Sequence, residues 1–106
     1  MKIIWSKLAS EAFKDIYKYH KEIAGIKIAQ NLKEKIFDST NQLKTQPNSG
    51  QAEETLKQLG QKHRYLVRGN YKVVYRKVRE GILITDIFDT RQDPKKINNP
   101  KRKSGN

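Results

Sequence analysis

The chain has 106 residues, of which 35% are hydrophobic and 32% charged, and its formal net charge at pH 7 is +12. This length suits one domain, because a single hydrophobic core commonly serves ~100 to 200 residues. So large a positive charge favours an anionic partner, such as nucleic acid, an anionic membrane surface or an acidic protein, and the absence of cysteine excludes disulfides and thiolate chemistry.

The sequence carries no sign of secretion or membrane insertion. Its beginning, MKIIWSKLAS, holds an apolar run of only three residues, which is too short for the hydrophobic region of a signal peptide. No stretch approaches the ~20 apolar residues that a membrane-spanning helix needs. We therefore expect a cytoplasmic protein without a membrane partner.

The first half of the chain predicts a short strand followed by two helices. Residues 2–5 form an apolar run that suits a strand, and Ser6 fits a helix N-cap. Apolar residues then recur on one face of a first helix that should end near Gly25, and of a second that should continue to Leu43. The two apolar stripes are Leu8/Ala9, Ala12/Phe13 and Ile16/Tyr17, then Ile28/Ala29, Leu32 and Ile36/Phe37. Helices joined by so short a turn form an antiparallel hairpin.

The second half predicts a loop and three strands. Residues 45–50 are typical of a loop, because Pro47 disfavours helix at the preceding residue. Residues 63–67, 71–78 and 82–89 are rich in Val, Ile, Tyr and Phe, which favour strands. Gly69-Asn70 and Glu80-Gly81 separate the runs and tolerate the backbone of tight turns. Two consecutive hairpins follow from this order.

These elements predict an α+β fold, in which the N-terminal strand joins a small, mainly antiparallel four-stranded sheet and the helical hairpin packs on one face of it. We expect a single domain over residues 1–97 and a basic, disordered tail over residues 98–106. The predicted core between helices and sheet comprises Trp5, Phe13, Ile16, Leu32, Ile36, Val73, Tyr75 and Ile84.

The strongest functional signal is a cluster of cations on the predicted strands. From Thr55 to Arg79 there is no Asp or Glu. The same stretch carries Lys57, Lys62, Arg64, Arg68, Lys72, Arg76, Lys77 and Arg79. Such a surface favours a polyanion. Whether Arg64 and Arg68 share a sheet face with Lys72 and Arg76 depends on the strand register, because a slip of one residue exchanges the faces.

Other kinds of chemistry find little support. His20 and His63 are the only imidazoles, and no Asp, Glu or His pair has metal-ligand spacing, so we expect neither a metal nor another cofactor, and no small-molecule substrate. His63 reads as an ordinary strand residue, and Tyr71 either as core or as a platform for a base. Asp86 and Asp89 should lie on opposite faces of the sheet because of their spacing.

RNA cleavage stays open as a chemistry, because the nucleophile is the substrate's own 2′-OH. A lysine held near other cations gives up its proton more readily and can act as a base, while arginines stabilise the charge that develops on the phosphate. Lys72, Arg76 and Arg91 are the natural candidates.

The order of these segments resembles the RelE/ParE superfamily of toxins from bacterial type II toxin-antitoxin systems. The resemblance covers roughly residues 2 to 97 and rests on WSKLASEAFKDI, QPNSG, LKQLGQKHRYLVRGNYKVVYR and ILITDIFDTRQDP in succession. It implies a helical hairpin on a small sheet, an active concave sheet face, and an antitoxin segment that wraps the toxin and blocks it.

The resemblance implies two alternative targets. RelE-like members cleave messenger RNA in the ribosome, and Arg64, Lys72 and Arg91 match their basic catalytic positions, although the ending TRQDPKKINNP holds neither Tyr nor His. ParE-like members poison DNA gyrase, and the Arg-x-Asp ending at Arg91 and Asp93 is somewhat closer to them. The chain is therefore an enzyme only in the first case.

The remaining expectations concern binding. The residues expected to contact nucleic acid or another target are Arg68, Arg76, Lys62 and Tyr71. An acidic cognate antitoxin should place Asp and Glu opposite Arg64, Arg68 and Lys72. The alternative to a toxin is a basic nucleic-acid-binding module without catalytic activity.

Overall fold

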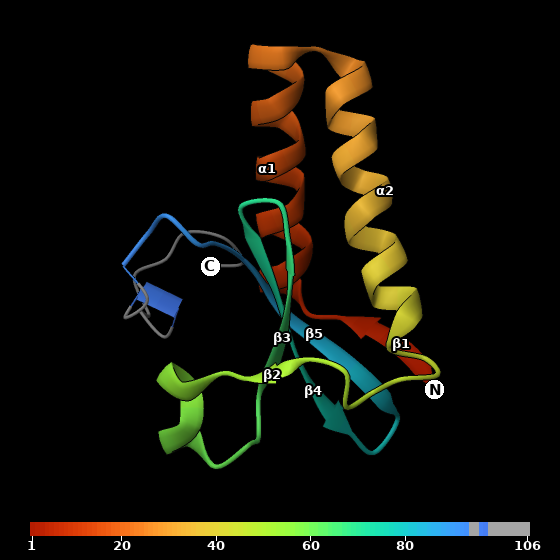
Figure 1. Ribbon diagram of the computed structural model, residues 1–106, viewed down its shortest axis with the longest axis vertical. Coiled ribbons are helices and arrows are strands. Elements are labelled where there is room, and N and C mark those ends of the chain that lie inside the picture. Colours follow the sequence, from red (N-terminus) through yellow and green to blue (C-terminus); the bar gives the residue numbers. More distant parts are fainter. Residues whose placement is uncertain (94–95, 98–106) are drawn as a thin grey trace.

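The computed structural model describes residues 1–93 and 96–97. In chain order the elements are β1 (Lys2–Trp5), α1 (Lys7–Ala24), α2 (Ile26–Gln42), β2 (Gln51–Ala52), the short 3-10 helix η1 (Glu54–Leu59), β3 (Arg64–Arg68), β4 (Tyr71–Val78) and β5 (Gly81–Asp89). The helices stand side by side as an antiparallel hairpin and extend beyond the sheet (Figure 1). The α+β fold expected from the sequence is confirmed, while the predicted tail, residues 98–106, lies outside the described residues.

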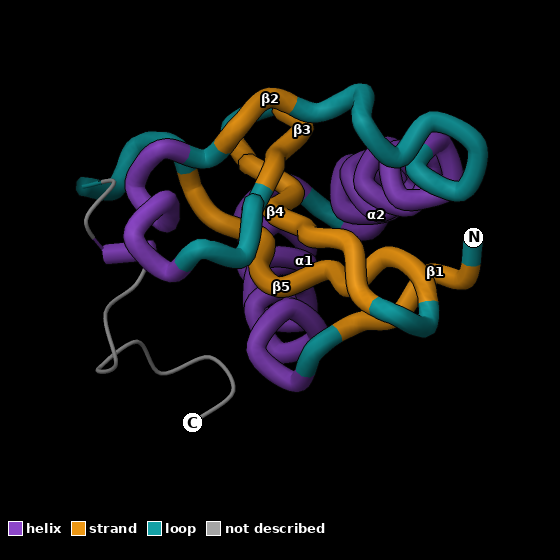
Figure 2. Tube along the Cα trace, turned by 90° about the horizontal axis from the view of Figure 1, so that it is seen from below, coloured by secondary structure: helices purple, strands orange, loops and turns teal. Residues whose placement is uncertain are grey.

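The sheet has five strands in the order β1-β5-β4-β3-β2. Only β1 and β5 run parallel, and the other neighbours are antiparallel. Figure 2, viewed from below, shows the strands in this order with both helices nearly end-on. The expected count of four strands was one too low, because β2 has only two residues and is defined by its pairing with β3 rather than by any pattern of its own.

Local signals set the boundaries of the helices. The Ser6 side chain accepts a hydrogen bond from the backbone N–H of Ala9, which caps the first turn of α1. Gly25 ends α1 and begins α2 with a φ of 93°, a backbone conformation that favours glycine. A single residue therefore makes the turn of the helical hairpin, where the sequence placed it.

The main core lies between the helical hairpin and the face of the sheet that it covers, here called the helix face. Ile36, Val73, Tyr75 and Ile84 are fully buried in it, and the other four predicted core residues, Trp5, Phe13, Ile16 and Leu32, pack against it partly exposed. The predicted apolar stripe of α2 includes too many residues, because Ile28 and Phe37 at its two edges are exposed.

The opposite face of the sheet, here called the distal face, has a small core of its own. It comprises Leu56 of η1, Val74, Phe88 and Ile97, with Tyr65 partly buried against them. The expectation that this face is only partly open agrees with the structure, because η1 covers part of it. The glycine at the start of β5 serves close packing, since a Cβ on Gly81 would overlap the backbone of Lys2 in β1.

Candidate functional site

The register of the β3–β4 hairpin settles which cations share a face. Arg64 pairs with Tyr75 of the helix face, whereas Lys72 pairs with Val67 and points to the distal face. Arg68, four residues after Arg64, lies on the helix face, where its guanidinium donates to the side-chain oxygen of Gln42 at 3.3 Å. Arg64 and Arg68 are therefore separated from Lys72 by the sheet.

Lys72 is held in an ion pair on the distal face. Its ammonium lies 2.7 Å from the Glu53 carboxylate and 4.3 Å from the centre of the Tyr65 ring. The hydroxyl of Thr55 donates to the same carboxylate at 2.7 Å. Burial by itself raises the pKa of Glu53, but the hydrogen bonds from Lys72 and Thr55 and the charge of Lys72 outweigh it, so the pKa lies below its usual value. The charge of Lys72 is therefore compensated by Glu53.

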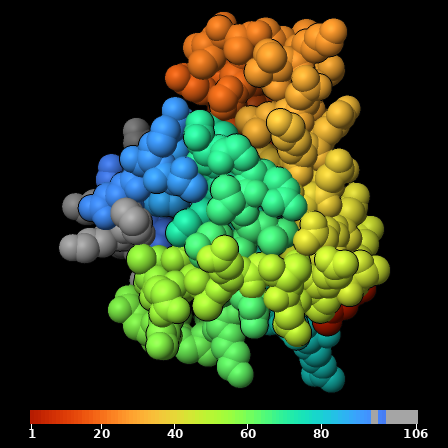
Figure 3. Space-filling model, in the orientation of Figure 1, coloured from red at the N-terminus to blue at the C-terminus, as the bar shows by residue number. Residues whose placement is uncertain are grey.

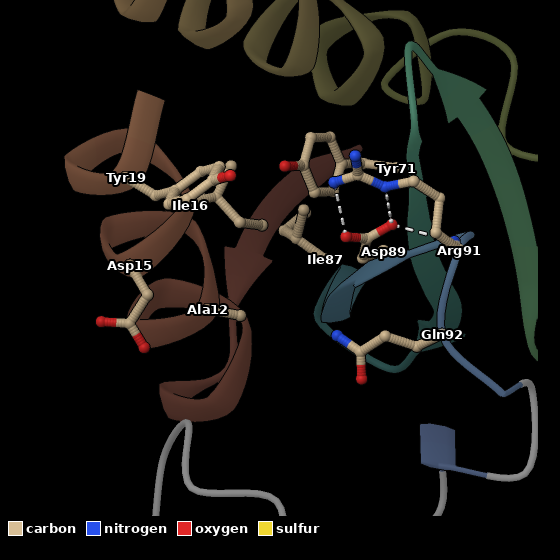
Figure 4. Close-up of a pocket in the computed structure, with 9 residues that line it drawn as sticks. All are labelled: Ala12, Asp15, Ile16, Tyr19, Tyr71, Ile87, Asp89, Arg91 and Gln92. Carbon is tan, nitrogen blue, oxygen red and sulfur yellow. Dashed lines mark hydrogen bonds and ion pairs between the residues drawn. The ribbon is translucent and has the colours of Figure 1, made fainter. Parts of the chain in front are cut away.

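Arg91 is bound in a similar way at the end of β5. Its Nε and Nη2 donate to the two carboxylate oxygens of Asp89 at 3.0 and 2.8 Å, and its backbone N–H donates to the same group at 2.9 Å (Figure 4). The hydrogen bond from Arg91 is the main cause that lowers the pKa of Asp89. A bidentate pair of this kind fixes the guanidinium and compensates its charge.

The Arg91–Asp89 pair borders a groove between α1 and the end of the sheet. The groove has a volume of about 370 Å³ and is lined by Ala12, Asp15, Ile16, Tyr19, Tyr71, Ile87, Asp89, Arg91 and Gln92, which Figure 4 shows on its two sides. Tyr71 is only 4% exposed, and its hydroxyl lies 2.9 Å from Nε2 of His20 in a hydrogen bond. Burial raises the pKa of this hydroxyl. Tyr71 thus belongs to the core, with little of its ring open to a partner.

A second pocket, here called the cationic pocket, lies at the other end of the β3–β4 hairpin. Its volume is about 280 Å³, and its lining residues are Asn48, Gln61, Lys62, Arg64, Tyr75, Arg76 and Lys77. Four of these seven residues are cations and none is a carboxylate. The pocket unites Lys62, Arg64 and Arg76, three of the site residues expected from the sequence.

His63 is buried beside this pocket. Its Nδ1 has no hydrogen-bond partner among the described residues. Burial is the largest cause that lowers the pKa of His63, the charge of Arg76 adds to it, and Glu53 partly opposes it. The prediction that His63 belongs to a strand is wrong by one residue, because β3 begins at Arg64 and the buried His63 lies in the connection just before it.

The three residues expected to catalyse RNA cleavage do not converge. Arg64 sits opposite Tyr75, while Asp89, which holds Arg91, pairs with Tyr71 four positions away along β4. At ~3.3 Å per residue this separates the two positions by roughly 13 Å. Lys72 lies on the other side of the sheet. Each of the three guanidinium or ammonium groups is also held by its own acceptor, which for Arg64 is the Gly50 carbonyl at 2.7 Å.

Sequence reasoning missed several residues of these sites. Glu53 was not connected with Lys72, although Glu53 and Glu54 are the last carboxylates before a long cationic stretch, a signal that could have suggested a partner. Asn48 and Gln61 carry no such signal, since Asn48 is a polar residue of the predicted loop 45–50 and Gln61 is a polar residue of the connection before the predicted strand 63–67. Lys77 lies in the cationic stretch, but it was not among the predicted site residues.

Within the described part of the chain, no group of three or more His, Cys, Asp or Glu residues is arranged to hold a metal ion. None of the helices described has the length and apolar content needed to cross a membrane.

Comparisons with known proteins identify the family. Residues 3–94 match the family model of the ParE toxin of the type II toxin-antitoxin system parDE. A solved structure, the chromosomal ParDE toxin-antitoxin system from P. aeruginosa, is similar with a TM-score of 0.70 and 19% sequence identity over 86% of this chain and 97% of that chain. A search of curated proteins finds no match. The structural likeness supports the fold, the family match covers most of the chain, and the protein therefore belongs to the ParE family of toxins from type II toxin-antitoxin systems.

Proposed function

We propose that this ParE-family protein stops bacterial growth by poisoning DNA gyrase rather than by cleaving messenger RNA in the ribosome. The observation that carries the choice is the separation of Arg64, Lys72 and Arg91. A cleavage site must bring a base and cationic groups to within a few ångströms of one phosphate. Here the sheet lies between Arg64 and Lys72, and two of the cations are paired with Glu53 and Asp89.

The same proposal includes an antitoxin as the partner that neutralises the protein. Its net charge of +12 favours an acidic segment that becomes ordered on binding. Because Arg64 and Arg68 face the helix side of the sheet and Lys72 the distal side, one straight segment does not reach all three. An antitoxin segment that contacts them must wrap around the edge of the sheet.

The test compares the two targets directly. Purified protein is added to DNA gyrase and relaxed plasmid, and both supercoiling and cleaved plasmid are followed on gels. A gyrase poison reduces supercoiling and accumulates cleaved DNA, while transcripts in induced cells stay intact. Transcripts cut within reading frames, together with unaffected gyrase, would contradict the proposal and favour ribosome-dependent cleavage. A basic binding module without activity would change neither readout.

Matched variants sharpen this comparison. Replacement of Lys72 or Arg91 by Met removes one positioned cation, which in a nuclease costs ~10² to 10³ in rate. Under the gyrase proposal neither variant gains or loses any RNA cleavage, because none occurs. Thermal unfolding of each variant must be measured alongside, since Lys72 also holds Glu53.

A further inference from the structure

The cationic pocket exists because β4 extends beyond the start of the neighbouring strand β3. β3 begins at Arg64, opposite Tyr75, whereas β4 continues through Arg76 and Lys77 to Val78. Over these last residues β4 pairs only with β5, so its other edge faces the pocket rather than a described strand. The chain entering β3 passes this gap at Lys62, which adopts a positive φ of 56°. Strand length thus leaves a recess at the edge of the sheet.

The cations of this recess lie close together without a carboxylate among the residues that line it. Lys57, Lys72 and Arg91 each lie within ion-pair distance of a carboxylate. Among the described residues, no carboxylate pairs with any of the four cations that line the pocket, Lys62, Arg64, Arg76 and Lys77. Four cations without a carboxylate partner in the described part of the chain therefore line one concave place, where together they attract an anion more strongly than a single cation on an open surface does.

Arg64 is oriented for such a ligand. Its Nη1 donates to the backbone carbonyl of Gly50 at 2.7 Å and, more weakly, to that of Asn48 at 3.4 Å. Carbonyl groups fix the guanidinium without cancelling its charge, and its remaining N–H groups can still donate. The wall behind it is rigid, because the hydroxyl of Tyr75 donates to the Pro47 carbonyl at 2.8 Å and accepts from the Gly50 N–H at 2.9 Å.

Size and chemistry narrow the ligand. Pockets for drug-sized molecules usually measure ~300 to 1,000 Å³, so a recess of about 280 Å³ suits one small anionic group. Arginine and lysine together with amide side chains such as Asn48 and Gln61 match the donor set that contacts phosphate oxygens of nucleic acids. One phosphate of a longer polyanion fits best, since the recess opens at the sheet edge and the rest of the ligand can continue over the surface.

We propose that the cationic pocket binds a backbone phosphate of duplex DNA. The choice of DNA rests on the proposed action on gyrase, whose substrate is DNA, whereas the phosphate chemistry rests on the pocket itself. The pocket then anchors the toxin to the DNA segment that gyrase holds. In the space-filling view the β3–β4 hairpin fills the centre of one face, between the helical hairpin and segment 44–60 (Figure 3).

The experiment measures binding of the purified protein to a short labelled DNA duplex by fluorescence anisotropy over a series of salt concentrations. Arg76→Gln and Lys62→Gln each remove a pocket cation and are not part of the anchoring at Gly50. Each substitution should weaken DNA binding by the same factor whatever the sequence of the duplex. It should also lower the slope of log Kd against log salt concentration by about 1. Lys33→Gln on α2 removes the same charge from a distant surface and should leave the slope unchanged.

Several results would overturn the proposal. Equal effects of the pocket variants and Lys33→Gln would mean that net charge alone drives binding. If the pocket variants lose more affinity for an RNA of the same sequence, or for an acidic peptide of the antitoxin, than for DNA, the pocket belongs to that partner instead. Inorganic pyrophosphate should compete with DNA for the wild-type protein and lose that effect in Arg76→Gln, and competition that survives in the variant counts against the pocket.

Gyrase assays on the same proteins keep the two proposals apart. If wild-type protein binds DNA through the pocket and gyrase is unaffected, the proposed function fails and the phosphate site stands. If gyrase is poisoned equally well by wild type and by Arg76→Gln, with unchanged DNA binding, the pocket proposal fails and the proposed function stands.

Discussion

Replacing Lys72 by Met tests whether this lysine is a structural cation. The change keeps most of the aliphatic stem and leaves the Glu53 carboxylate, whose side chain is 3% exposed, with Thr55 as its one remaining hydrogen-bond partner among the described residues. Removing one partner of a buried ion pair commonly costs about 3 to 5 kcal/mol. Because the Lys72 side chain is 20% exposed, water can reach part of the site, and we expect a loss of about 3 kcal/mol, near the lower end.

The assay is urea unfolding followed by the fluorescence of Trp5, the single tryptophan, which packs edge-on against Phe13 and Phe37. The matched control is Lys57→Met. Lys57 lies 4.0 Å from Glu54, and the two side chains are 82% and 74% exposed. Surface pairs of this kind contribute ~0 to 1 kcal/mol, so the control should barely change the unfolding free energy.

A second substitution separates the lost charge pair from lost packing. Glu53→Gln in the Lys72→Met background removes the unpaired buried carboxylate and should recover part of the loss, which a double-mutant cycle measures as coupling. If Lys72→Met costs no more than Lys57→Met, or if Glu53→Gln recovers nothing, the ion pair does not stabilise the fold. Lys72 would then be available for chemistry, which would weaken the argument against a nuclease.

Three further predictions concern the fold. Ile36→Ala should lower the free energy of unfolding by ~2 to 5 kcal/mol because Ile36 is fully buried, and Ile28→Ala on the same helix, where the side chain is 50% exposed, should cost much less; equal unfolding midpoints would show that the core face of the helix is assigned wrongly. Gly81→Ala should destabilise the protein by more than ~1 kcal/mol, since the new Cβ overlaps the backbone of Lys2, and an unchanged thermal midpoint would exclude that overlap. Burial lowers the pKa of His63 from its ordinary value of 6.5, so the unfolded protein takes up a proton on this side chain more readily than the folded protein does. The contribution of His63 to the free energy of unfolding is therefore fully present above pH 6.5 and is lost as the pH falls through the lowered pKa. The thermal unfolding midpoint should therefore fall on acidification, and it should fall less in His63→Gln than in the wild type. Equal falls in both proteins would show that another group causes the loss of stability.

The sequence by itself determined those parts of the structure that local interactions decide. Ser6 and Gly25 bound α1 because a cap and a positive-φ residue act on their immediate neighbours. The three long strands follow from runs of branched and aromatic residues, and β4 has the predicted bounds. The buried positions of Ile36 and Val73 follow from helix and strand periodicity.

Tertiary structure alone decided how the cations are distributed. A register shifted by one residue would have brought Arg64 to the face of Lys72, and nothing in either strand's own pattern forbids that. The pairing of Lys72 with Glu53 joins residues 19 positions apart, and β2 exists only because β3 lies beside it. The composition thus determined that the protein is strongly basic, whereas long-range pairing determined which of its charges stay uncompensated, because compensation depends on the distance between side chains that the chain brings together only when it folds.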